Sequence, residues 1–194
     1  MYTDLICFDS KENFGFSKVI KIELIRASSA KELEKKIQRF RQEITIVEGS
    51  DLNRLIVENK YVDILVSPEK NRREDFMHHR NSGLNQVLCK LAFKNSIAIA
   101  FSFNDVLKAK GIERSKIIGR MMQNVRLCRK YKVKMITASF AANEFEIKNP
   151  SDLISFGIVI GMAPKEAKEA LMNVDIVLKE KENKKSGGVR IIGV

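Results

Sequence analysis

The 194-residue sequence contains no tryptophan, two histidines and three cysteines, and each shortage narrows the chemistry available to the chain. Three cysteines far apart within apolar sequence indicate reduced, packed thiols and disfavour a disulfide framework. They are Cys7, Cys89 and Cys128. The basic neighbours of Cys128 would favour a reactive thiolate, but helical spacing turns this side chain to an apolar face, which favours packing.

The two histidines, His78 and His79, are adjacent in the sequence. Adjacent side chains point about 100° apart on a helix and to opposite faces of a strand, so one metal ion would not readily bind both. Metal-dependent hydrolytic barrels gather several histidines together with carboxylates. The sequence therefore disfavours a metal site. It also lacks the G-x-S-x-G motif that would accompany a serine nucleophile.

Long apolar runs and targeting signals are also lacking. The longest apolar runs, 97–101 and 157–162, are far shorter than the roughly 20 residues of a membrane-spanning helix. The N-terminus shows neither a basic leader nor a small-residue cleavage site, so we expect a cytoplasmic protein without membrane contact. No G-x-G-x-x-G or P-loop sequence follows the first predicted strand, which disfavours a nucleotide-binding sheet.

Apolar runs alternate with helical periods along the whole chain. Helices are predicted at 29–42, 51–60, 83–95, 151–162 and 164–172, together with one that begins near Ser115. Strands are predicted at 4–8, 19–25, 43–47, 62–67, 97–101, 134–139, 174–178 and 189–193. Short apolar strands joined by crossover helices require a mostly parallel sheet that is covered on both faces.

We therefore predict an α/β fold, a compact TIM-like barrel of parallel strands with crossover helices, that forms a single domain over residues 1–194. The usual barrel of this kind has about 250 residues, so this one would be compact or degenerate. An open doubly wound sheet is the alternative. The charged, glycine-rich segment at about 179–188 is predicted to be a mobile loop before the last strand.

Positive charge is concentrated in the middle of the chain. The net charge is 0 over residues 1–70, +10 over residues 71–148 and +1 over residues 149–194. A protein that is basic only for solubility has no reason to localise its charge, whereas a polyanion-binding surface does. An accident of composition on a solvated face is the alternative.

The segment 117–134 carries six lysines and arginines and no acidic residue. A helical wheel buries an apolar arc that contains Ile117, Ile118, Met121, Met122, Val125 and Cys128. The opposite arc is predicted to face outward as a positive stripe that binds phosphates, formed by Lys116, Arg120, Arg126 and Lys130 with Gly119 and Gln123 among them. A solvated face balanced by acids on neighbouring elements is the alternative. Arg129 falls within the apolar arc, which predicts a pair with a buried carboxylate or a backbone carbonyl.

A second basic cluster follows the predicted strand 62–67. Because loops after parallel strands form the binding rim, we expect three arginines there, Arg72, Arg73 and Arg80. Local ion pairs with Glu74 and Asp75 would neutralise Arg72 and Arg73. Asp9 and Glu48 end predicted strands, where catalytic acids are found, although pairing with a rim arginine is the more common outcome.

Several segments together resemble one family, the protein component 3 subunits of archaeal ribonuclease P, which are similar to a subunit of the eukaryotic enzyme. The sequence RMMQNVRLCRKYKV is the most specific of them, and FGFSKVI at 14–20 is also similar. The resemblance covers 62–172 almost continuously, in the segments VDILVSPEKNRRED, HHRNSGLNQVLCKLAFKNSIAIAFSF, GRMMQNVRLCRKYKVKMITAS and PSDLISFGIVIGMAPKEAKEAL.

This resemblance implies a barrel similar to metal-dependent phosphoesterases that lacks their metal-binding histidines. It implies that the chemistry belongs to a catalytic RNA, which uses Mg²⁺ to remove the 5′ leader from precursor tRNA, and that the protein itself binds no cofactor. The implied partners are the ribonuclease P RNA, a small α/β protein subunit in a heterodimer or heterotetramer, other proteins of the holoenzyme, and precursor tRNA as its substrate.

Carried onto this chain, the resemblance makes seven residues candidates for RNA contact: Arg72, Arg73, Arg80, Lys116, Arg120, Arg126 and Lys130. The sequence HHR at 78–80, directly before NSG, departs from the family pattern, in which a shorter and arginine-rich segment is expected at this place. With most phenylalanines in apolar runs, recognition is expected through phosphates and shape and not through base stacking.

Two other functions remain open from the sequence. One is a metal-dependent phosphoesterase that acts on its own through His78, Asp9 or Glu48. The other is a scaffold whose basic face binds an acidic protein partner.

Overall fold

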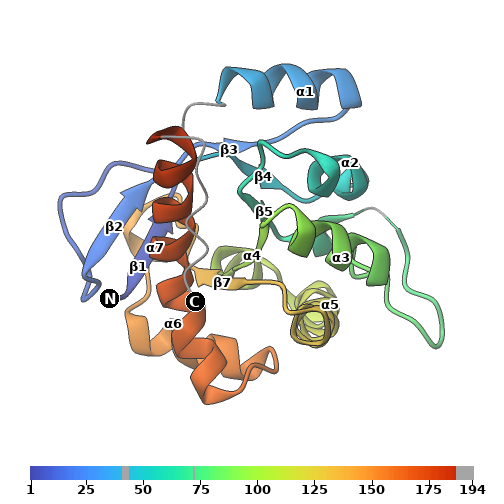
Figure 1. The fold of residues 1–194 in the computed structure, drawn as a ribbon. Helices are drawn as coiled ribbons and strands as arrows, with labels where there is room; N and C mark the ends of the chain where they lie inside the picture. Colours follow the sequence, from blue (N-terminus) through green and yellow to red (C-terminus); the bar gives the residue numbers. More distant parts are fainter. Residues whose placement is uncertain (41–43, 72, 187–194) are drawn as a thin grey trace.

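The computed structural model describes residues 1–40, 44–71 and 73–186, and its strands are all parallel (Figure 1). One sheet pairs β1 (Thr3–Ile6) with β2 (Lys18–Lys21). The other has five strands in the order β3-β4-β5-β6-β7. Their bounds are β3 Leu24–Ile25, β4 Ile46–Glu48, β5 Ile64–Val66, β6 Ala98–Ser102 and β7 Met135–Ala138.

The two sheets follow one another around a barrel. β2 and β3 are two parts of the strand predicted at 19–25, and they pair with β1 and β4 respectively. On the other side, β1 meets the end of β7 through two backbone hydrogen bonds, from Phe140 N to Leu5 O at 2.9 Å and from Cys7 N to Ala141 O at 2.8 Å. The predicted compact TIM-like barrel is confirmed, although ladder hydrogen bonds do not run around its whole circumference.

Helices cover the outer face of the larger sheet. The outward side chains Leu65, Ile99 and Phe101 share one core with apolar residues of α2 (Asn53–Glu58), α3 (Gln86–Lys94) and α5 (Gly111–Tyr131). The remaining helices are α1 Ala30–Arg39, α4 Phe103–Lys108, α6 Pro150–Val159 and α7 Pro164–Ser186, with short 3-10 turns η1 Pro68–Lys70 and η2 Glu144–Glu146.

The inner face of the sheet is covered by α7 (Figure 1). Side chains alternate along each strand, so β6 turns Ala98 and Ala100 inward. These small residues leave room for Val174 and Val177 of α7, which belong to the same apolar cluster. A buried ion pair fixes the helix further along, between Lys181 Nζ and Asp63 Oδ2 at 2.8 Å.

The C-terminal predictions are corrected by this helix. The strand predicted at 174–178 is wrong, because Val174 and Val177 lie three residues apart on one face of α7. A short apolar run fits a strand or a buried helix equally well by periodicity. The loop predicted at 179–188 is helical through Ser186, and the rest of it, with the strand predicted at 189–193, lies outside the described residues. In the described part of the chain, no helix is long and apolar enough to cross a membrane.

Candidate nucleic-acid interface

Arg120 of α5 is buried and holds a loop against the helix. This loop, residues 71–85, follows η1 and is called the rim loop below. The Arg120 guanidinium donates from Nε to Asp75 Oδ1 at 2.8 Å and from Nη1 to the Glu69 carbonyl at 2.9 Å, and Nη2 donates to the Arg73 carbonyl. Only 3% of Arg120 is exposed. The prediction that Arg120 belongs to the outward stripe is therefore wrong.

Two further polar residues of α5 bind the rim loop. Gln123 Nε2 donates to the Arg80 carbonyl at 2.9 Å, and Asn124 Nδ2 donates to the Ser82 carbonyl at 2.8 Å. Gly119 lies beneath Arg80, since a Cβ at Gly119 would fall 1.1 Å from Arg80 Nη1. The helical wheel identified Met121, Val125 and Cys128 as buried, but a wheel cannot show that a distant loop covers a second face.

The remaining stripe residues reach the surface. Arg126 and Lys130 are exposed, and Lys116 is half-buried. In the part of the chain that the structure describes, no salt bridge involves these three cations. The Lys130 ammonium lies 5.6 Å from the centre of the Tyr131 ring. The outward positive surface of α5 is confirmed for these residues, while their contact with RNA stays a prediction.

The predicted pairing of Arg129 is confirmed. Its guanidinium binds both carboxylate oxygens of Glu166, at 2.8 and 2.6 Å, and donates to the Gly161 carbonyl at 2.7 Å. Hydrogen bonding between the two groups raises the pKa of Arg129 and lowers that of Glu166. The pair is more open than predicted, since 44% of the Arg129 side chain is exposed.

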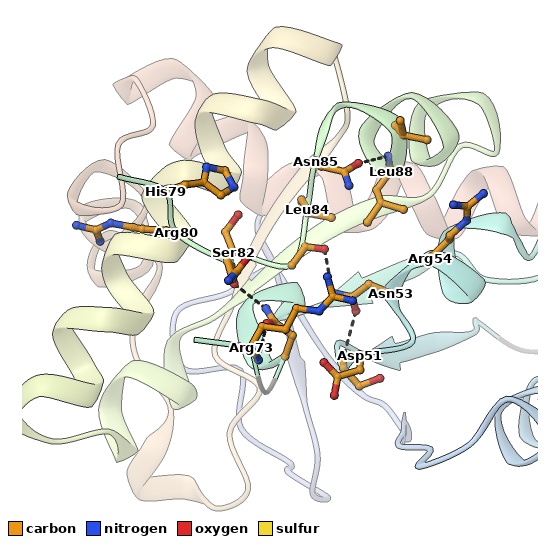
Figure 2. A pocket seen from close by; sticks show the side chains of 15 residues that line it. Asp51, Asn53, Arg54, Arg73, His79, Arg80, Ser82, Leu84, Asn85 and Leu88 are labelled. Atoms are coloured by element: carbon orange, nitrogen blue, oxygen red, sulfur yellow. Dashed lines mark hydrogen bonds between the residues drawn. The ribbon is translucent and has the colours of Figure 1, made fainter. Parts of the chain in front are cut away.

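A pocket of about 370 Å³ opens between the rim loop, the segment that follows β4, and the first turn of α3 (Figure 2). Three arginines line it, Arg54, Arg73 and Arg80, against a single acidic residue, Asp51. His79 and several amide side chains complete the lining. The guanidiniums of Arg73 and Arg54 suit an anionic group that accepts hydrogen bonds, such as a phosphate, although Arg54 Nε also pairs with Glu58 Oε1 at 2.9 Å. The Arg80 guanidinium points away from the pocket and lies over Gly119 of α5.

The pocket floor is fixed by Asn53. Its Nδ2 donates to the Pro68 carbonyl at 2.8 Å and to the Gly83 carbonyl at 3.1 Å, which joins α2, η1 and the rim loop. Gly83 has φ +81°, and a Cβ there would lie 1.8 Å from the Pro68 carbonyl oxygen, so this close approach requires glycine. The predicted rim position of Arg73 and Arg80 is confirmed, whereas Arg72 lies outside the described residues.

Sequence reasoning missed Arg54, Asn53 and the other amides of the pocket. One available signal was that Arg54 lies close after the predicted strand 43–47, because loops after neighbouring parallel strands meet on one rim.

The mouth of the barrel is occupied by ion pairs. Lys70 Nζ lies 2.7 Å from both Glu48 Oε1 and Asp105 Oδ1, and Arg26 Nε lies 2.7 Å from Glu48 Oε2. Burial works against these charges, but the cations outweigh it and lower the pKa of Glu48. Burial likewise opposes the charge of Lys70, and the two carboxylates outweigh it and raise its pKa. The predicted pairing of Glu48 with an arginine is confirmed.

The candidates for metal chemistry do not come together. Asp9 pairs with Lys21 at 2.5 Å, and His78 and His79 are exposed on the rim loop. Among the described residues, no group of three or more histidines, cysteines or acids could hold a metal ion.

Fold and site together define a parallel α/β barrel whose mouth is filled by ion pairs and which carries exposed cations on the outer rim and on α5. The family model described as RNase P subunit p30 matches residues 8–186, and the chain belongs to this family.

Archaeal relatives agree with this family. The ribonuclease P protein component 3 of Methanococcus maripaludis strain C6 is 33% identical over 153 residues, which cover 77% of this chain and 62% of that protein. The component 3 protein of Methanosarcina mazei is 32% identical over 180 residues, 91% of this chain and 72% of that protein. The chain thus spans less than two thirds of the Methanococcus relative.

A solved structure shares the fold. A chain in a cryo-EM structure of archaeal ribonuclease P with mature tRNA is 25% identical and superposes with a TM-score of 0.72, over 99% of this chain and 86% of that chain.

Proposed function

We propose that this chain is an RNA-binding protein subunit of ribonuclease P, which binds and stabilises the catalytic RNA that removes 5′ leaders from precursor tRNA. The observation that carries the proposal is a continuous basic surface, formed by the pocket that Arg54 and Arg73 line, the Arg80 guanidinium over α5, and the exposed cations of α5, which have no salt bridge within the described residues. Family membership and the likeness to a chain of an archaeal ribonuclease P support it.

The contact surface differs from the stripe expected from sequence. Arg120 leaves it, because its donors are used within the protein, and Arg54 joins it. The proposed contacts are Arg54, Arg73, Arg80, Lys116, Arg126 and Lys130, with Arg72 retained as a prediction. Guanidinium groups bind phosphate oxygens in bidentate fashion, and folded RNA is recognised mostly through phosphates, shape and 2′-hydroxyls.

The remaining parts of the proposal concern the holoenzyme. The catalytic RNA supplies the chemistry with Mg²⁺, and the protein binds no cofactor of its own. A small α/β subunit joins this chain as a heterodimer or heterotetramer, other ribonuclease P proteins complete the particle, and precursor tRNA is its substrate. The ion pairs of Glu48 fit a barrel mouth without hydrolytic chemistry.

Salt dependence of RNA binding tests the proposal. The variant Arg73→Ala/Arg80→Ala/Arg126→Ala should flatten the slope of log K against log salt by up to about two units, at roughly 0.7 for each phosphate that is no longer bound. A matched variant that removes three exposed lysines elsewhere, Lys31, Lys35 and Lys168, should keep the parent slope. Equal slopes for the two variants would show that binding follows net charge and not this surface.

Reconstitution tests the wider assignment. Adding this chain and its small α/β partner to archaeal ribonuclease P RNA should stimulate cleavage of precursor tRNA at moderate Mg²⁺. Absence of stimulation by correctly folded protein would refute the proposal.

A further inference from the structure

The tip of the rim loop is a tight hairpin that exposes an aromatic ring. Phe76 and His79 face each other as an antiparallel bridge, with hydrogen bonds from Phe76 N to His79 O at 2.8 Å and from His79 N to Phe76 O at 3.3 Å. Met77 and His78 form the turn between them. Phe76 is 70% exposed and Met77 is 93% exposed. Large apolar side chains in solvent, surrounded by polar residues, mark interaction sites.

The pleat of the hairpin decides which way Phe76 points. Residues next to each other along a strand face opposite sides, and directly opposed residues share a side. Asp75 and Arg80 both turn to α5, since Asp75 binds Arg120 and the Arg80 guanidinium lies over Gly119. Phe76 and His79 therefore share the other side of the hairpin.

That other side faces the arginine pocket. His79 lines the pocket, and Figure 2 shows His79 and Arg80 pointing to opposite sides of the loop. Because Phe76 lies directly opposite His79, its side chain is on the side of the hairpin that faces the pocket, just beyond the residues that line it.

Both arms of the hairpin are held from below. On the first arm, Arg120 donates to the Arg73 carbonyl and to Asp75. On the second arm, Gln123 donates to the Arg80 carbonyl at 2.9 Å, and the two arms are joined by Asn81 N, which donates to Asp75 Oδ1 at 2.8 Å. Presenting an ordered ring reduces the entropy cost of binding.

We propose that Phe76 stacks on an unpaired nucleobase of RNA while a phosphate of the same strand enters the arginine pocket. The inference rests on the proposed function and adds a base contact that the composition did not favour. Bases within a duplex are already stacked on each other, so only an unpaired nucleotide can offer its face to Phe76. Arg73 lines the pocket and can bind the phosphate, and Arg54 can join it with its Nη groups, since its Nε donates to Glu58.

The surroundings of Phe76 favour RNA over a protein partner. The exposed apolar surface at the tip consists of Phe76 and Met77, and imidazole and guanidinium groups border it. Four asparagines and three arginines are among the residues that line the pocket beside it. A ring next to cations suits a nucleotide, which combines a flat apolar face with a negative charge.

The test compares two RNA hairpins that differ only in one bulged adenosine, together with a fluorescent adenine analogue at the bulge. Parent protein should bind the bulged hairpin more tightly and quench the analogue. Phe76→Ala should weaken binding to the bulged hairpin by about fivefold to a hundredfold, the range measured for one base–aromatic stack. Binding to the fully paired hairpin and the salt slope should stay the same, because no cation is removed.

Three matched variants sharpen the result. Phe76→Trp should keep affinity and quenching, whereas Phe76→Leu, which retains apolar area without a ring, should lose most of both. Phe145→Ala removes a phenylalanine that is 92% exposed in η2 and should behave like the parent. Parent-like binding by Phe76→Ala, or by Phe76→Leu, would overturn the stacking proposal. The stacking proposal would also be overturned if Phe76→Ala kept its RNA affinity but no longer bound the small protein subunit. Parent protein that binds neither hairpin nor ribonuclease P RNA would instead refute the proposed function.

Discussion

Arg120 and Asp75 form an ion pair at 2.8 Å that joins the middle of α5 to the hairpin arm of the rim loop, 45 residues away in sequence. The arginine is buried, while a quarter of the Asp75 side chain remains exposed. Although burial opposes its charge, the Arg120 guanidinium lowers the pKa of Asp75. Arg120 of the basic helix α5 therefore holds the rim loop in place, while Arg126 and Lys130 of the same helix lie on the surface.

Arg120→Ala should destabilise the protein by about 3 kcal/mol or more, because it removes the cation that pairs with Asp75 and the donor to the carbonyls of Glu69, Asn71 and Arg73. Urea unfolding measures this destabilisation. Arg120→Lys should recover little, since an ammonium cannot bind several acceptors in the geometry of a guanidinium. A stable Arg120→Ala protein with a flattened salt slope would place this side chain on RNA after all.

Arg126→Ala should have the opposite pattern. The free energy of unfolding should change by less than about 0.5 kcal/mol, as for other exposed positions. The slope of log K against log salt for ribonuclease P RNA should fall by roughly 0.7, the contribution of one phosphate contact. Titrations at several salt concentrations measure it. An unchanged slope would remove Arg126 from the interface.

Arg129→Ala should reduce stability by about 1 kcal/mol, a value limited by the exposure of the pair to solvent. RNA affinity should be nearly unaffected, because the guanidinium already binds Glu166 and the Gly161 carbonyl. A double-mutant cycle with Glu166→Gln, followed by thermal unfolding, measures the coupling. A coupling energy near zero would contradict a structural role for the pair.

Glu69 should make stability fall as pH rises. Burial raises its pKa from 4.5 to about 8, so the folded carboxyl stays protonated at pH values where the unfolded one ionises. The contribution of Glu69 to the free energy of unfolding is fully present below pH 4.5. It declines between pH 4.5 and about pH 8, by at most about 1.4 kcal/mol per pH unit.

Glu69→Gln tests that pH dependence. The amide cannot ionise, and it can donate to the buried Asn124 Oδ1, which has no hydrogen-bond partner within the described residues. Unfolding curves of parent and variant should diverge steadily between pH 5 and pH 8, with the variant more stable at the upper end. Parallel curves would mean that Glu69 is already ionised in the folded protein.

Elements with a strong local pattern were predicted well. The apolar runs at 62–67 and 97–101 became β5 and β6, and the helix predicted from residue 29 begins as α1 with Ser29 as its N-cap. The run at 174–178 failed because Val174, Ile176 and Leu178 fit the period of a strand, whereas Val174 and Val177 fit that of a helix, and packing against the inner face of the sheet decided between them. For the site, Arg73 and Arg80 were found because loops after parallel strands converge, whereas the same signal was not applied to Arg54, and the amides of the pocket stand in no pattern that marks a site.

The sequence by itself determined parallel strands alternating with helices, a localised positive charge and a helix fastened by Met121, Val125 and Cys128, because periodicity and charge are local properties. Only the tertiary structure decided what each cation does. Arg120 and Arg126 carry the same group on the same helix, yet the rim loop covers one and leaves the other in solvent. That difference depends on contacts between residues distant in sequence, as does the exposure of Phe76 at the tip of the rim loop.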